Sequence, residues 1–228
     1  MNTNLTDHIL NPDYTAEKTE SFSNEVLTQT SLEDKPKPSV FIYFLLGNSA
    51  LLAFNIAINA IDIFKPLFTE LNLNIGVAIS RAYNIPSAVI ALLLIFFKPK
   101  NLKISISIAL IALILVMCTM PILFSIQSLK DNAETLYWIV VVLLGCTGFF
   151  SSLLLSSTYA FASQCGPAAS TAVSSGNGAC GVIAAFLRII TKAALSKNET
   201  ISSILYYSVA GLILFLTLIY FFIAIQRN

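Results

Sequence analysis

The sequence lacks charged side chains over its longest apolar stretch, because residues 135–187 contain no Asp, Glu, Lys or Arg. In the whole chain of 228 residues, 11% of the residues are charged and 56% are hydrophobic, whereas an ordinary soluble domain has roughly 25% charged residues. A soluble core could not hide this much uncharged chain, but a bilayer requires ~20 apolar residues for each helix that crosses it. The sequence therefore predicts an all-α membrane protein with several transmembrane helices.

The membrane part of the chain also lacks the groups on which most catalytic sites depend. The sole histidine, His8, lies near the N-terminus, and the four cysteines stand singly in or beside apolar segments. The sequence contains no phosphate-binding loop, no nucleophile–base pair and no metal-binding spacing. We therefore expect that the protein is not an enzyme, needs no metal or cofactor, and binds no nucleic acid.

Residues 1–38 form a polar tail that differs in composition from the rest. The tail carries seven acidic residues and three lysines, whereas residues 39–228 carry five acidic residues and ten Lys or Arg. It shows no amphipathic period and ends in Lys35-Pro36-Lys37-Pro38, where proline blocks a continuing helix. We expect a disordered cytoplasmic tail at 1–38 and a transmembrane domain at 39–228, whose first helix serves as an uncleaved signal.

Uncharged windows bounded by polar residues predict six transmembrane helices. A break at Cys165-Gly166-Pro167 divides the longest uncharged stretch between the fourth and the fifth helix. Each window can cross ~30 Å of hydrocarbon with some tilt. The expected spans are residues 40–61, 76–97, 104–126, 136–162, 171–192 and 203–225.

The positions of Lys and Arg predict how the helices are oriented, because loops rich in positive charge stay in the cytoplasm. With the tail inside, six basic residues lie near the inner helix ends and four near the outer ends. Both termini are therefore expected in the cytoplasm.

Polar side chains interrupt the first span at positions that share a helix face. Asn48, Asn55 and Asn59 are seven and four residues apart, which places their amides on one stripe. A buried amide in lipid needs a partner. The stripe therefore either bonds to neighbouring helices or lines a watery cavity.

The fifth span combines small residues with a basic side chain. Gly176, Gly178 and Gly181 form a surface on which another helix can pack closely. Arg188 follows seven residues after Gly181 on the same face. Its guanidinium could meet an anionic or carbonyl-bearing ligand, pair with Asp62, or reach outward.

Several of these segments resemble the equilibrative nucleoside transporter family. Gly47-Asn48-Ser49-Ala50-Leu51-Leu52-Ala53-Phe54-Asn55 is similar to the family's first-helix motif, a lead into Leu-Leu-Pro-Trp-Asn, with Ala53 and Phe54 in place of Pro and Trp. Ser175-Gly176-Asn177-Gly178-Ala179-Cys180-Gly181 resembles the Ser-Gly-Gln-Gly-x-x-Gly signature that opens the fifth helix, with Asn177 in place of Gln. Tyr83-Asn84-Ile85-Pro86-Ser87 and Leu187-Arg188-Ile189-Ile190-Thr191-Lys192-Ala193 are also similar to segments of protozoan members.

The resemblance implies a fold like the N-terminal half of a major-facilitator bundle and facilitated movement of nucleosides or nucleobases down their gradient. It also implies the plasma membrane as the location. In such a protein the first helix lines the substrate path, where Phe54 could stack on a base and Asn55 could orient polar edges. The residues expected along the path are Leu51, Phe54, Asn55, Ile58, Asn84, Ser87 and Arg188.

The resemblance covers six of the family's eleven helices, so it reaches only an N-terminal half. Leu155 stands where many relatives carry a cavity Gln. One half of such a bundle would expose its polar wall to lipid, so we expect a homodimer or a complementary C-terminal half to cover it. The alternatives are a truncated, nontransporting scaffold or regulatory subunit, and a homodimeric carrier of another small polar solute.

Overall fold

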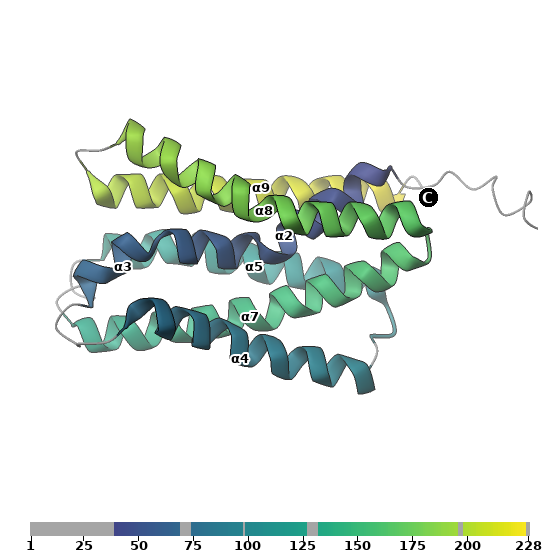
Figure 1. Cartoon of the computed structure of the whole chain (residues 1–228), viewed down its shortest axis with the longest axis horizontal. Helices are drawn as coiled ribbons and strands as arrows, with labels where there is room; N and C mark the ends of the chain where they lie inside the picture. The colour runs from purple at the N-terminus through teal and green to yellow at the C-terminus, as the bar shows by residue number, and fades with distance from the viewer. Residues whose placement is uncertain (1–38, 69–73, 98, 127–131, 196–197, 227–228) are drawn as a thin grey trace, which may run out of the picture. The chain divides into compact units, whose positions relative to one another are not determined.

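The computed structural model describes residues 39–68, 74–97, 99–126, 132–195 and 198–226, so the expected tail at 1–38 lies outside the described residues. Within these ranges the chain forms seven α-helices and no β-strand. Six of the seven are long and apolar enough to cross a membrane, which confirms the expected all-α architecture. The helices are α2 (Val40–Asn59), α3 (Ile61–Leu67), α4 (Ile75–Phe96), α5 (Leu102–Ser125), α7 (Ala133–Ser163), α8 (Pro167–Ala194) and α9 (Glu199–Gln226) (Figure 1).

The membrane-length helices correspond one to one with the six expected spans, with differences at their ends. The first expected span continued to residue 61, but α2 ends at Asn59, the chain turns at Ala60, and the short α3 follows. The fifth span was expected to begin at residue 171, but α8 begins at Pro167. Proline is favoured in the first turn of a helix, and Gly166 precedes it at φ 106°, a conformation that suits glycine.

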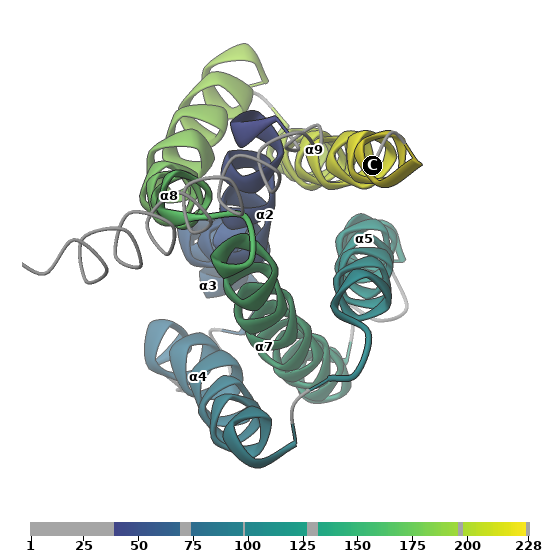
Figure 2. The ribbon, with the colours of Figure 1, turned by 90° about the vertical axis from the view of Figure 1, so that its right-hand side faces the viewer.

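The bundle is organised around α2 and α7. α2 packs mainly against α8, α7 packs against α4 and α5, and α5 also packs against α9. Seen end-on, α5 and α9 lie together on one side of α2 and α7, whereas α4 and α8 lie on the other side, apart from each other (Figure 2). The α4 and α8 helices therefore flank the centre of the bundle without packing extensively against each other.

Glycines allow two of the helix pairs to approach backbone to backbone. A Cβ atom at Gly47 of α2 would collide with the carbonyl of Val173 in α8, and one at Gly176 of α8 would collide with the carbonyl of Phe44 in α2. Gly148 of α7 lies equally close to a backbone carbonyl of α4. Small residues at such crossings are how helices associate in lipid, where apolar burial alone gives little driving force. The α2–α8 and α4–α7 pairs are therefore the tight units of the fold.

Candidate functional site

One stripe of α2 is accessible, although the rest of this part of the helix is buried. Between residues 46 and 59 the accessible positions are spaced by three, one, three and one, as on one face of a helix. They are Leu51, Phe54, Asn55, Ile58 and Asn59. Four of these five are residues that the sequence predicts along a substrate path.

Asn48 does not share this stripe, although its spacing predicted that it would. Its side chain is buried, with 3% exposure, and its backbone nitrogen lies beside Gly176 at the α2–α8 crossing. The spacing of seven is near two helical turns, but the close approach of α8 covers this end of the face. Asn48 thus belongs to the packed interface, and Asn55 and Asn59 belong to the accessible stripe.

An aromatic pair joins the stripe to α4. The rings of Phe54 and Tyr83 are stacked, with centroids 4.0 Å apart and an interplanar angle of 21°. Tyr83 is 4% exposed, whereas Phe54 is partly accessible. The stacked ring of Tyr83 therefore fixes the orientation of the Phe54 ring.

Asn55 is held in place from both α2 and α8. Its Nδ2 donates to the carbonyl of Leu51 at 3.0 Å and to Sγ of Cys180 at 3.1 Å. Cys180 in turn donates to the carbonyl of Asn177 at 2.8 Å, and a Cβ at Gly181 would lie 3.5 Å from Oδ1 of Asn55. The motifs around Asn55 and Cys180, far apart in sequence, therefore meet in the structure.

Ser87 lies at the contact of α4 with α7 and is partly buried. Its Oγ is 2.6 Å from Oγ of Ser152, which also donates to the Ser87 carbonyl at 3.0 Å. Ile58, a further expected path residue, is partly buried and packs against the apolar core. Both side chains therefore border the protein interior.

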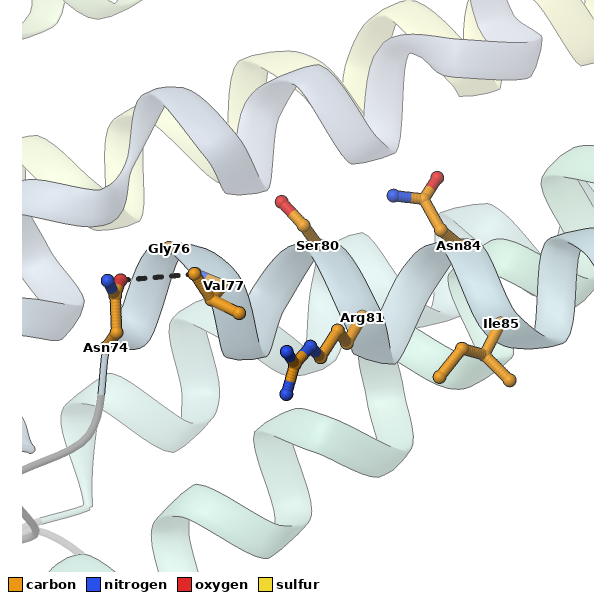
Figure 3. A pocket seen from close by; sticks show the side chains of 7 residues that line it. All are labelled: Asn74, Gly76, Val77, Ser80, Arg81, Asn84 and Ile85. Atoms are coloured by element: carbon orange, nitrogen blue, oxygen red, sulfur yellow. Dashed lines mark hydrogen bonds between the residues drawn. The ribbon is translucent and has the colours of Figure 1, made fainter.

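Asn84 is exposed and lines a pocket of about 450 Å³ along α4. Ser80 and Asn84 extend from one side of the helix, and Arg81 and Ile85 extend from the other (Figure 3). At the start of the helix, Oδ1 of Asn74 accepts a hydrogen bond from the backbone N–H of Val77 at 3.4 Å. The exposed polar surface of α4 is thus confined to its first half.

Arg188 forms an ion pair with Asp62 of α3, one of the three alternatives that the sequence left open. Its Nη2 lies 2.8 Å from both carboxylate oxygens, and Nζ of Lys192 lies 2.7 Å from Oδ2. The guanidinium carbon also lies 5.5 Å from the centroid of the Tyr206 ring, a cation–π contact. Arg188 is 8% exposed, so it acts as an anchor between α8 and α3.

The surroundings of Asp62 favour its charged form. Burial raises the pKa of the Asp62 carboxyl, but the hydrogen bonds and positive charges of Lys192 and Arg188 outweigh burial and hold this pKa below its usual value. Asp62 therefore stays ionised near neutral pH and fixes the ends of α3 and α8 together.

The three glycines of α8 differ in their surroundings. Gly176 is in backbone contact with α2, and a Cβ at Gly181 would make an ordinary contact with Asn55. A Cβ at Gly178 would meet nothing within 4 Å, and Gly178 is exposed. The close approach of α2 therefore depends on Gly176 and not on Gly178.

Two residues of this site were missed by the sequence reasoning. Tyr83 backs the Phe54 ring, and Cys180 binds the Asn55 amide. Tyr83 opens the segment that resembles a second-helix motif, so its aromatic ring was an available signal. Nothing near Cys180 in sequence indicates an amide partner, because Asn55 is 125 positions away.

The fold and the site define a multi-pass integral membrane protein of the all-α class. In comparisons with known proteins, no family model matches the chain, and no curated protein and no solved structure matches it significantly.

Proposed function

We propose that this chain is a passive carrier of nucleosides or nucleobases, or one half of such a carrier, with its substrate path along the accessible stripe of α2. The observation that carries the proposal is the partial accessibility of this stripe in a part of α2 that is otherwise buried. Leu51, Phe54, Asn55 and Ile58 are accessible in a helix segment whose other side chains are almost all buried. An amide that is accessible in a membrane helix is expected to face a partner or a watery path.

The chemistry of the stripe suits a planar, polar solute. Phe54 has one ring face against Tyr83, and a base could stack on its other side, an interaction worth about 1–3 kcal/mol per base. Asn55 uses its amide N–H groups within the protein, so its Oδ1 is the atom that could accept a hydrogen bond from a substrate N–H or O–H. Asn84 and Ser87 of α4 would border the same path.

A half-carrier needs a second wall. Because α4 and α8 do not pack extensively against each other (Figure 2), a second copy of the chain or a complementary C-terminal half would cover the surface between them. The distribution of Lys and Arg supports both termini in the cytoplasm. The plasma membrane is part of the same proposal and rests on the resemblance alone.

Uptake of radiolabelled uridine and adenosine in transport-deficient cells tests the proposal. Saturable uptake that is not driven by an ion gradient is expected, and Phe54→Ala should lower its kcat/KM by about 5- to 100-fold if the stacking contact is lost. Phe186→Ala is the matched control, because Phe186 is 63% exposed on α8 away from the stripe. Wild-type protein at the cell surface without saturable flux would rule out an autonomous carrier.

A second candidate function, a nontransporting scaffold or regulatory subunit, is favoured by a different observation. The amide nitrogen of Asn55 bonds to Cys180 of α8, and the hydroxyl of Ser87 bonds to Ser152 of α7, as polar groups that only join helices would. Copurification with a full transporter at one-to-one stoichiometry, with flux unaffected by Asn55→Ala, would support this candidate. Asn101→Ala is the control, because the Asn101 side chain makes no cap hydrogen bond.

A further inference from the structure

A groove of about 640 Å³ lies between α5 and α9, the two helices on the side of the bundle away from α4 and α8 (Figure 2). Its volume is in the range of pockets that enclose small-molecule ligands. Several lining side chains, including Cys118, Leu212 and Phe215, are exposed. Both walls are membrane-length apolar helices, so the molecules that reach this groove are those dissolved in the bilayer.

The groove is as long as one leaflet of a membrane is thick. Its α5 wall runs from Ile114 to Ile126 and its α9 wall from Ile204 to Phe215. At 1.5 Å per residue each wall is about 16–18 Å long, roughly half of the ~30 Å hydrocarbon core. Ile126 directly follows the end of α5, and Ile204 lies near the start of α9. The groove therefore extends from one membrane edge to about the midplane, which fits a molecule confined to a single leaflet.

The lining is uncharged, and its polar side chains are hydroxyls. Among the described residues that line the groove there is no Lys, Arg, Asp or Glu, so none of them would neutralise the phosphate of a phospholipid. Ser125 lies at the end of the groove that is near the membrane edge. Its hydroxyl donates to the carbonyl of Pro121 at 2.9 Å, so its Oγ can still accept a hydrogen bond. Ser208, nearer the midplane than Ile204, is exposed and makes no hydrogen bond within the described part of the chain. A neutral lipid with a hydroxyl at one end complements this pattern.

A glycine contributes to the floor of the groove. Gly211 contributes no side chain, and a Cβ there would make only an ordinary contact, 3.6 Å from Cβ of Met117. A rigid apolar body loses little conformational freedom when it is bound, which favours it over a flexible acyl chain. From the length, the hydroxyls, the uncharged side chains among the described lining residues and the missing side chain at Gly211, we propose that the groove between α5 and α9 binds a sterol-like lipid.

This site goes beyond the proposed carrier function, and its test does not measure transport. The full chain is reconstituted in phosphatidylcholine vesicles with a photoactivatable sterol, and labelled peptides are identified by mass spectrometry. Labelling is expected to concentrate in residues 114–126 and 204–215 and to fall when unlabelled sterol is added. A photoactivatable phosphatidylcholine, used in parallel, is expected to label the lipid-facing helices without this concentration.

Two variants test the geometry and the hydrogen bond separately. Cys118→Phe fills the groove and should lower sterol labelling at least about fivefold, whereas Val142→Phe, at an exposed position on α7, should not. Ser208→Ala keeps the space and should lower sterol labelling about two- to tenfold, the loss of one hydrogen bond. Equal labelling by phosphatidylcholine, labelling that unlabelled sterol does not reduce, or a Cys118→Phe variant that labels like the wild type would each overturn the site.

Discussion

Gly176 and Gly178 form a matched pair for testing the close approach of α2 and α8. They are two residues apart in the same helix and in the same motif, but they face different surroundings. A Cβ at position 176 would collide with the carbonyl of Phe44 and lie 2.9 Å from the backbone nitrogen of Asn48, whereas a Cβ at position 178 would meet nothing within 4 Å. Both substitutions therefore add one methyl group, which collides with the backbone of α2 in Gly176→Ala and meets no neighbouring atom in Gly178→Ala.

The expected difference between the two variants follows from the structure. Backbone atoms cannot rotate away, so Gly176→Ala must push α2 and α8 apart, and overpacking of this kind costs about 1–3 kcal/mol. Gly178→Ala creates no collision, and the higher helix propensity of alanine stabilises a helix interior by up to about 1 kcal/mol. The gain in helix propensity is common to both variants, so the collision alone separates them by about 1–3 kcal/mol, which for a chain of this length is a difference in Tm of roughly 2–12 °C.

Thermal unfolding of the purified protein in one detergent measures this difference. The wild type and both variants are heated in parallel, and the fraction that remains monodisperse is followed by size-exclusion chromatography. Gly176→Ala should lower the Tm, and Gly178→Ala should leave it unchanged or raise it slightly. Gly47→Ala, on the α2 side of the same crossing, should behave like Gly176→Ala because its Cβ would meet the carbonyl of Val173.

Equal Tm values for Gly176→Ala and Gly178→Ala would refute the reasoning. Such a result would mean that α2 and α8 are not in backbone contact at this crossing. A low Tm for both variants would also contradict it, because Gly178 would then face a neighbouring helix. Only the ordered result, with position 176 sensitive and position 178 tolerant, agrees with the structure.

Three further predictions concern the ends and the contacts of the helices. Asp62→Asn should destabilise the protein by about 1–2 kcal/mol near neutral pH, because Arg188 loses its carboxylate while the partial exposure of Asp62 moderates the cost. The pKa of Asp62 is lowered in the folded protein. Its contribution to stability is therefore complete above the unfolded pKa of about 3.9 and is lost as the pH falls through the lowered pKa. The difference in Tm between Asp62→Asn and the wild type should thus be constant between pH 7 and 5 and should disappear at more acidic pH. Ser87→Ala and Ser152→Ala should be non-additive in a double-mutant cycle, with a coupling of about 0.5–1.5 kcal/mol, whereas additive losses would show that the two hydroxyls do not interact. The proposed orientation can be tested in a cysteine-free background with an impermeant thiol reagent added outside cells. The reagent should label Ala194→Cys directly and Ser163→Cys only after the cells are permeabilised. The reverse pattern of labelling would show that the orientation is inverted.

The number of membrane helices and most of their ends could be predicted from the sequence, because hydropathy and proline act locally. The Cys165-Gly166-Pro167 break lies where α7 ends and α8 begins, since the backbone preferences of Gly and Pro do not depend on distant contacts. The short α3 could not be predicted in the same way. The apolar run continues through Ala60, and the turn there brings Asp62 to the end of α8, a reason that only the packed structure reveals.

The sequence indicated which part of α2 belongs to the candidate site, but not which residues that part contacts. The resemblance to a first-helix motif singled out Leu51, Phe54, Asn55 and Ile58, and the structure leaves these four positions partly accessible on one side of α2. Spacing cannot say what lies opposite, so Asn48 was assigned to the same stripe although α8 buries it. Asp62 and Arg188 are 126 positions apart in the sequence, so no local pattern could predict their ion pair.

The structure gives α2 two different environments, and this difference determines how its polar residues should be understood. In the first half of the helix Asn48 and Ser49 are buried, and Ser49 joins α2 to α9 because it donates to Oγ1 of Thr217 at 3.2 Å. In the second half Phe54 and Asn55 are accessible, and their polar and aromatic contacts hold them in fixed orientations. Because a fixed and accessible group can recognise a solute but a buried one cannot, any recognition by α2 must depend on the second half. The first half then holds α2 firmly against α8 and α9.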